Sequence, residues 1–285
     1  MAGVKAQIFH PKDVAFRCEA PFDKLFFKKN FIFNKQHEVF VIHEMWAARE
    51  AKIARDKGIR YIIQVQGGYD IFRKADTGAV YAAYQHAELI TCVSDDIYAC
   101  LVYLFPEFEQ KIYRLHLSVE ENLFKPAIQK ENLITYMPRK LEKHSTLVLN
   151  YIARKLPASW KIFPIQNMNQ QAVANTLAKS KIFLSFSELE GLGLPPIEAA
   201  LAGNLVIGYT GQAGKEYWLD GQFHEVSCGD IRTFSEMILS KIREIDSGHF
   251  DFKQIKENIT TLQDKYSPVK ELAGLRGLVN QLIKG

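Results

Sequence analysis

The sequence predicts an α/β protein built from two domains, each a parallel sheet covered by helices. Short apolar runs alternate with helical stretches along most of the chain, and their hydrophobic residues are consecutive rather than alternating. Consecutive apolar residues are typical of strands buried on both faces, and alternation with helices is typical of parallel sheets. A length of 285 residues is enough for two modest domains.

The first half of the chain contains five expected strands, with helical periodicity between them at residues 45–57 and 77–87. A polar stretch that ends in proline, residues 119–126, is expected to link the domains. We therefore assign residues 1–118 to an N-terminal domain. Its strands are expected at residues 7–10, 38–43, 61–65, 89–93 and 112–117.

The second domain is expected to span residues 127–265, with a closing C-terminal helix in residues 266–285. Helical periodicity covers residues 231–246 and 267–284. The strands of this domain are expected at residues 132–136, 147–149, 161–164, 182–186 and 205–209.

Composition excludes several classes of protein. A net charge of +4 without a dense Lys/Arg stripe argues against nucleic-acid binding. The four cysteines form no CxxC pair, which argues against a zinc site. No apolar run reaches the roughly 18 residues of a membrane span, and the N-terminus does not resemble a signal peptide, so we expect a cytoplasmic protein.

Residues 22–33 depart from the general pattern because they combine five Phe with three Lys. One interpretation is a peripheral contact with the inner face of a membrane, with lysines beside aromatic rings. The other is a partly buried helix whose lysines face solvent.

The most informative segment is residues 182–218, which has the order strand, loop, helix, strand. We expect Glu190 in the loop and Glu198 in the first turn of a helix that begins at Pro195-Pro196. Ligands bind at the carboxyl ends of the strands in open α/β sheets. Carboxylates accept hydrogen bonds from vicinal hydroxyls, and Gly191 and Gly193 allow the backbone to approach a ligand closely.

Glu190 and Glu198, within "EGLGLPPIEAALAGNLVIG", resemble the E-x7-E motif of family 4 and related glycosyltransferases of the GT-B fold. The resemblance implies two Rossmann-like domains facing a central cleft, and retaining transfer from a nucleotide-diphospho-sugar. It implies that Glu198 holds the ribose and Glu190 faces the donor sugar. The alternative is a helix-dipole role for Glu198 and a solvated Glu190. The implied donor-binding residues are Glu198, Gly191, Leu192, Gly193, Leu194, Gly214 and Glu216.

Arg139 and Lys140 follow the first expected strand of the second domain. A bidentate Arg and a point-charge Lys suit the developing charge of a leaving diphosphate. Family 4 enzymes carry such a pair near this region, although Lys143 competes for the lysine position. The alternative is a solvated basic pair. The predicted catalytic residues are therefore Glu190, Arg139 and Lys140.

On the first-domain side, the resemblance places His43, Gln66, Gly67 and Gly68 at the cleft. The alternative for His43 is a structural role at the end of its strand. Gln66 stands where many relatives carry a histidine, and its amide cannot act as a base. The two glycines after it allow close approach.

The sequence thus predicts a glycosyltransferase of polysaccharide biosynthesis, acting without a cofactor on a glycan or lipid-linked acceptor. No D-x-D motif occurs, so we expect no metal. One alternative is a non-catalytic nucleotide-sugar-binding partner subunit of the same fold. Another is a GT-B sugar-nucleotide epimerase.

Overall fold

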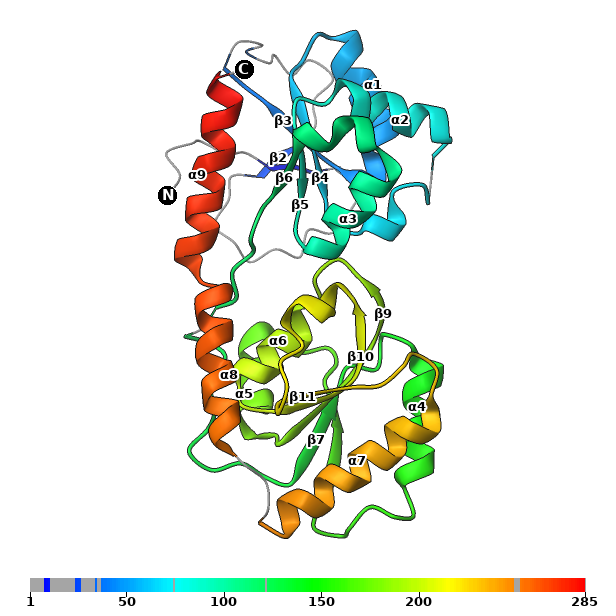
Figure 1. Cartoon of the computed structure of the whole chain (residues 1–285), viewed down its shortest axis with the longest axis vertical. Coiled ribbons are helices and arrows are strands. Elements are labelled where there is room, and N and C mark those ends of the chain that lie inside the picture. Colours follow the sequence, from blue (N-terminus) through cyan, green and yellow to red (C-terminus); the bar gives the residue numbers. More distant parts are fainter. Residues whose placement is uncertain are drawn as a thin grey trace.

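The computed structural model describes residues 8–10, 24–26, 34, 37–73, 75–120, 122–248 and 252–284. Two α/β domains lie end to end, and two successive helices run along one side of both (Figure 1). All strand pairs among these residues are parallel. The predicted α/β class with parallel sheets is confirmed.

Among the described residues, the main sheet of the first domain has four strands in the order β3-β4-β5-β6. Helices α2 and α3 begin at side-chain caps, since Asp76 and Ser94 accept backbone N–H bonds from Ala79 and Ile97. β1 (Ile8–His10) and β2 (Lys24–Phe26) form a separate pair. The other elements are β3 (Phe40–His43), η1 (Glu44–Trp46), α1 (Ala47–Asp56), β4 (Tyr61–Val65), η2 (Gly68–Asp70), α2 (Thr77–His86), β5 (Ile90–Cys92), α3 (Asp95–Leu104), η3 (Pro106–Lys111) and β6 (Ile112–Arg114).

The second domain is a five-stranded sheet in the order β11-β10-β9-β7-β8. After β7 the chain moves to one side of that strand, and β9 lies on its other side, so strand order reverses between β7 and β9. Ligands bind at such a reversal in open α/β sheets. The elements are β7 (Leu133–Tyr136), α4 (Glu142–Ile152), β8 (Lys161–Pro164), α5 (Gln170–Lys179), β9 (Ile182–Glu190), α6 (Leu194–Leu201), β10 (Leu205–Gln212), η4 (Ala213–Tyr217), β11 (Phe223–Glu225), α7 (Ile231–Asp246) and α8 (Phe252–Lys265).

One expected strand is wrong. Residues 147–149 lie inside helix α4, which buries Ser145, Val148 and Ile152 and leaves Leu147 36% exposed. Burial at spacings of three and four is the pattern of a helix face. A three-residue apolar run does not distinguish a strand from a buried helix segment, whereas the longer repeat does.

The expected loop at residues 187–194 is also shorter than predicted. β9 continues to Glu190 and stays paired with β10 through Ser187↔Thr210 and Glu190↔Gln212, with a register shift before the last pair. Glu190 therefore lies on a strand extension that the sheet holds in place. Glu198 lies in the second turn of α6 rather than in its first, because the helix begins at Leu194.

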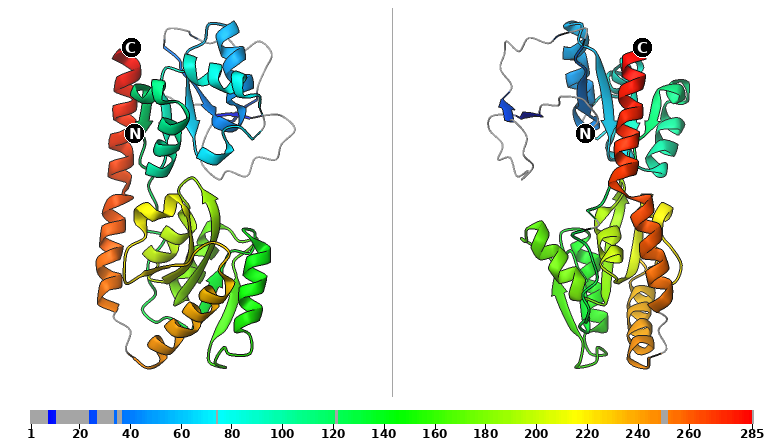
Figure 2. Two further views of the ribbon diagram at one scale, coloured as in Figure 1. Left: turned by 45° about the vertical axis from the view of Figure 1, so that its right-hand side comes forward. Right: turned by 90° about the vertical axis from the view of Figure 1, so that its left-hand side faces the viewer.

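The C-terminal part of the chain returns to the first domain. After α8 on the second domain, α9 (Pro268–Lys284) lies along the first (Figure 2). There Arg60 donates to the Leu282 carbonyl at 2.7 Å, and the Tyr113 hydroxyl donates to the Gly274 carbonyl at 2.8 Å. The chain thus crosses between the domains twice, before β7 and between α8 and α9.

The Phe/Lys segment at residues 22–33 lies outside the described residues except for Lys24–Phe26. These three form β2, so this part is not the helix that one interpretation predicted. Within the described part of the chain, no helix has the length and apolar character needed to cross a membrane.

Candidate functional site

A pocket of about 130 Å³ lies at the carboxyl ends of β7 and β9, where the strand order of the second domain reverses. Three predicted catalytic residues, Arg139, Lys140 and Glu190, come together in its wall. Sequence reasoning missed its remaining residues, which follow β7, lie along β9 or begin α6. They are Met137, Phe183, Leu184, Ser185, Phe186, Ser187, Pro195 and Pro196.

Lys140 and Glu190 form an ion pair across this pocket, with Lys140 Nζ 2.6 Å from Glu190 Oε1. The two side chains are 45% and 20% exposed, so water reaches both. Leu141, which follows Lys140, has φ 43° and ψ 53°. A left-handed non-glycine residue is uncommon, and such backbone is concentrated at functional sites. The turn after β7 therefore places a cation against the carboxylate at the end of β9.

The opposite side of Glu190 is packed against the end of β10. A Cβ added at Gly211 would lie 3.0 Å from Glu190 Cγ, and Gly211 has φ +64°. The next residue, Gln212, has φ 67° and ψ −67°, a strained conformation for a non-glycine residue. Glycine at 211 thus makes room for the Glu190 side chain between β10 and Lys140.

Glu198 lies in α6 but is not part of the pocket wall. Burial raises the pKa of its carboxyl group to about 7, because low-dielectric surroundings disfavour the charged form. Among the described residues, no hydrogen bond or ion pair reaches this carboxylate. It therefore has free hydrogen-bonding capacity, as a ligand-binding carboxylate requires.

The turn between β9 and α6 touches the first domain directly. A Cβ added at Gly191 would lie 1.5 Å from the Gln66 carbonyl oxygen and 3.3 Å from Ile97 Cδ1. The close approach that requires glycine here is thus between the two domains. Gly193 has φ +78°, and its carbonyl accepts a bond from the Tyr217 hydroxyl at 2.8 Å. Leu192 is 4% exposed and Leu194 is 36% exposed.

On the first-domain side, Glu44 is a functional candidate that sequence reasoning missed. Its oxygens accept the backbone N–H of Gln66 at 3.2 Å and of Gly67 at 3.0 Å. One of them also lies 3.0 Å from Nδ1 of His43, whose side chain is 39% exposed. Burial raises the pKa of Glu44, and His43 opposes that shift. Gly68 lies against Cys100 of α3. Glu44 could have been found from the sequence, because it directly follows the polar residue that ends β3.

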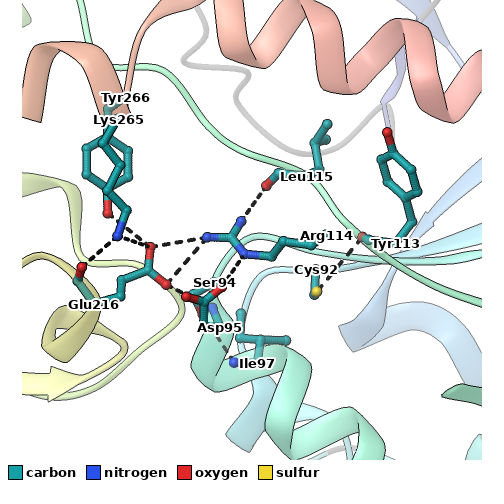
Figure 3. A network of polar contacts seen from close by, with 10 residues as sticks. All are labelled: Cys92, Ser94, Asp95, Ile97, Tyr113, Arg114, Leu115, Glu216, Lys265 and Tyr266. Atoms are coloured by element: carbon teal, nitrogen blue, oxygen red, sulfur yellow. Dashed lines mark hydrogen bonds and ion pairs between the residues drawn. The ribbon is translucent and has the colours of Figure 1, made fainter.

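A network of charges joins the two domains (Figure 3). Arg114, at the end of β6, lies 3.1 Å from Oε1 of Glu216 and 3.1 Å from Oδ1 of Asp95. The Asp95 backbone N–H donates to the other Glu216 oxygen at 2.8 Å. The Arg114 and Glu216 side chains are only 15% and 6% exposed. This hinge network therefore holds η4 of the second domain against the first.

Lys265 and Tyr266, where the chain returns from the second domain to the first, contribute to the same network. The Tyr266 hydroxyl donates to Glu216 Oε1 at 2.9 Å, and Lys265 donates to the Glu216 backbone carbonyl at 2.6 Å. Both carboxylate oxygens of Glu216 thus have protein partners, and the residue lies outside the pocket wall. The Glu216 side chain is bonded within the protein, and its role in donor binding stays a prediction. Gly214 is buried beside Tyr217.

Except for Glu198, which lies apart in α6, the predicted charged and polar residues form three groups. Arg139, Lys140 and Glu190 line the pocket, His43 and Gln66 lie around Glu44, and Glu216 belongs to the hinge. Gly191 joins the first two groups. Within the described residues, no group of three or more His, Cys, Asp or Glu side chains is arranged to hold a metal ion.

The known proteins that this chain resembles include a curated glucosyltransferase and solved structures with the same fold. No family model matches the chain. A curated α-1,6-glucosyltransferase of Actinobacillus pleuropneumoniae serotype 7 (strain AP76) is 27% identical over 105 residues, which are 36% of this chain. The match spans about a third of that relative, 32% of its length.

Two solved structures are similar over most of the chain. HepE of Anabaena in complex with UDP-glucose superposes with a TM-score of 0.66 at 11% identity, covering 84% of this chain and 78% of HepE. The chain has the GT-B fold. Sucrose-phosphate synthase of Thermosynechococcus elongatus also has a TM-score of 0.66, at 12% identity over 86% of this chain and 74% of the synthase. The expected GT-B architecture is thereby confirmed.

Proposed function

We propose that this GT-B protein transfers a sugar from a nucleotide-diphospho-sugar to a glycan or lipid-linked acceptor, with retention and without a metal. The observation that carries the proposal is the Lys140–Glu190 pair in a pocket at the strand reversal of the second domain. The resemblance of Glu190 and Glu198 to the family 4 motif supports retention.

Each charged group has a role in this reaction. Arg139 and Lys140 stabilise the negative charge that develops on the leaving diphosphate. Glu190 hydrogen-bonds the donor sugar, and Glu198 holds the ribose hydroxyls. When donor phosphate takes Lys140 as its partner, Glu190 is released toward the sugar. Because water reaches both side chains of this partly exposed pair, the pair costs little to separate, and the donor replaces one ionic contact with another.

Closure of the domains excludes water, which otherwise hydrolyses the donor. The contact between Gly191 and Gln66 supports closure at this point, beside the donor carboxylate. We place the protein in the cytoplasm, with peripheral membrane contact through residues 22–33 as a further proposal.

Binding of nucleotides and donors tests the proposal. Thermal stabilisation by UDP, GDP, ADP and dTDP is measured in chelator, followed by sugar release and transfer with the matching donor. UDP-glucose is the first donor to try, because HepE was solved with it and the curated relative is a glucosyltransferase. Stabilisation by one diphosphate and sugar release in chelator are expected. No stabilisation and no sugar release overturn the proposal, and proton NMR of the product tests retention.

The second candidate is a non-catalytic partner subunit that binds the same donor. Gln66 favours it, because its amide cannot act as a base at the cleft position. Binding of a nucleotide-sugar without any hydrolysis or transfer by the purified chain would support this candidate. Slow donor hydrolysis by the chain alone would exclude it.

A further inference from the structure

The proposed function gives no role to a group of exposed aromatic side chains in the first domain. Tyr69 in η2, Phe72 shortly after it and Tyr81 in α2 are 45%, 37% and 38% exposed. Large apolar side chains that gather on a surface, rimmed by polar groups, mark interaction sites. We call these three side chains the aromatic surface.

Ring contacts hold the aromatic surface together. The centroid of the buried Phe105 ring lies 6.2 Å from that of Phe72 and 6.3 Å from that of Tyr81. The Tyr81 ring also lies 5.3 Å from that of Phe108. Tyr69 and Phe72 are three residues apart, and side chains at this spacing lie above one another in a 3-10 turn. The three exposed rings therefore form one surface that Phe105 and Phe108 support from beneath.

Carboxylates fix the two tyrosines of the aromatic surface. The Tyr69 hydroxyl donates to Asp96 at 3.0 Å, and the Tyr81 hydroxyl donates to Glu107. A ring that is held at its hydroxyl end loses little further freedom when a ligand packs on it. An ionised carboxylate has about four acceptor sites, so it can also accept hydroxyl groups of a ligand. The surface thus combines oriented rings with acceptors for hydroxyl groups.

One end of the aromatic surface adjoins the contact between the domains. Tyr69 follows the turn that begins with Gln66, whose carbonyl lies against Gly191 of the second domain. Its partner Asp96 is in the first turn of α3, and the start of α3 bonds the second domain (Figure 1). Glu107 follows the other end of α3, so the surface leads away from this contact. A chain bound along it would have one end at the cleft.

The charges around the aromatic surface favour a neutral ligand rich in hydroxyl groups. Two cations of this part of the domain have protein partners, since Arg73 pairs with Asp70 at 3.3 Å and Lys111 donates to two backbone carbonyls. The carboxylates of Asp96 and Glu107 repel a polyanion or an anionic lipid. Sugar rings carry C–H groups on their faces and hydroxyl groups at their edges. They can therefore pack on aromatic rings while they bond carboxylates.

We propose that the aromatic surface binds a neutral glycan chain, the part of the acceptor that precedes the sugar to which transfer occurs. This inference rests on the proposed function and narrows its acceptor to a glycan of several sugars. The sugars pack on the ring faces and donate hydroxyl hydrogen bonds to Asp96 and Glu107, and the end of the chain enters the cleft. Binding along the surface raises the effective concentration of that end at the site.

Affinity electrophoresis tests glycan binding without any transfer reaction. Gels that contain dextran, amylopectin or hydroxyethylcellulose, all neutral, are compared with gels that contain no polysaccharide. At least one polysaccharide is expected to retard the wild-type chain. Tyr69→Ala and Tyr81→Ala are each expected to weaken the apparent Kd about 10-fold, because each removes a ring on which a sugar packs. Tyr69→Phe keeps the ring and is expected to retain most of the binding.

Tyr151→Ala is the matched control, since this tyrosine is 56% exposed on α4 of the second domain. It is expected to bind like the wild type, and circular dichroism checks that every variant is folded. No retardation by any of the polysaccharides overturns the inference, as does wild-type binding by both alanine variants of the aromatic surface. Binding of poly-lysine in place of a glycan, lost in Tyr69→Ala, also overturns it and assigns the surface to a basic partner.

Transfer kinetics connect the aromatic surface with the reaction. Short and long oligosaccharides of the retarding polysaccharide are compared as acceptors, with the donor that the nucleotide screen selects. Tyr81→Ala is expected to lower kcat/KM about 10-fold more for the long acceptor than for the short one. Equal losses for both overturn the inference. A wild-type chain that binds glycan but never transfers or hydrolyses a donor refutes the proposed function instead, so the two failures are distinguishable.

Discussion

The two sides of the cleft hold their charges in opposite ways. In the second domain, Lys140 and Glu190 are partly exposed and bonded to each other. In the first domain, Glu44 is buried and bonded to the backbone of the next turn. An exposed pair separates at little cost, whereas a buried carboxylate fixed by N–H groups keeps its position. Under the proposed function, the Lys140–Glu190 pair exchanges partners when the donor binds, whereas the turn held by Glu44 is preorganised.

The largest expected effect comes from replacing either member of the partly exposed ion pair in the second domain. Lys140→Met and Glu190→Gln are each expected to lower kcat/KM for transfer by about 100- to 1000-fold, because each removes charge stabilisation or donor contact in the transition state. Thermal unfolding should stay near that of the wild type, since an exposed ion pair contributes at most about 1 kcal/mol.

Lys143→Met is the matched control for the lysine. Lys143 is exposed in α4, outside the pocket wall, and competes with Lys140 for the diphosphate role. Wild-type transfer by this variant is expected. A larger loss from Lys143→Met than from Lys140→Met would move the diphosphate contact to Lys143.

The next prediction tests whether the ion pair of the hinge network, like Glu44, is a buried charge that the fold holds in place. Arg114→Met leaves the Glu216 carboxylate, 6% exposed, without its main counter-charge. Removing one partner of a buried pair is expected to lower the free energy of unfolding by about 3 kcal/mol, measured in urea. The double variant Arg114→Met/Glu216→Gln should recover part of this loss. Equal stability of Arg114→Met and the wild type would contradict the role of the hinge network.

A smaller effect is expected where the two sides meet. The methyl group of Gly191→Ala would overlap the Gln66 carbonyl, so the turn must move away from the first domain. We expect a loss of about 2 kcal/mol in stability and slower transfer, with nucleotide binding retained. Gly78→Ala, in α2 beside only the Asp76 side chain, is the control. If Gly191→Ala transfers normally, contact at this point is not part of the catalytic state.

The smallest effect concerns pH. Because burial raises the pKa of Glu198 from 4.5 to about 7, the folded protein holds a proton there that the unfolded chain loses at lower pH. Stability from this group is present below pH 4.5 and falls as pH rises toward 7. Glu198→Gln is expected to flatten the pH dependence of unfolding by about 1 kcal/mol, a value discounted for partial exposure. An unchanged slope would mean that Glu198 is ionised throughout.

The sequence predicted the donor side better than the acceptor side, for a physical reason. Glu190 and Glu198 belong to one strand–helix unit, so their spacing reports their relative position. Glu44 acts on backbone groups 22 and 23 residues away, whose N–H atoms carry no side-chain signal. Its importance becomes visible only when β3 and β4 are paired.

Contacts between segments that are distant in the sequence also explain the errors in the predicted secondary structure. The predicted bounds of β4 and β8 are correct, although β4 is buried almost throughout and β8 is a partly exposed strand at the edge of its sheet. The length of β9 depends on its pairing with β10, which a single strand does not reveal. Likewise, the apolar run at residues 147–149 is helical because it lies between other turns of α4.

The position of α9 has a consequence for synthesis of the protein on the ribosome. Arg60 donates to the Leu282 carbonyl, a contact between residues 222 positions apart, and Tyr113 likewise bonds Gly274. Domains usually fold in order as the chain emerges, the N-terminal one first. Here the first domain gains these contacts only after the whole second domain has been translated. Until α9 is translated, the surface of the first domain that binds α9 therefore stays exposed on the nascent chain.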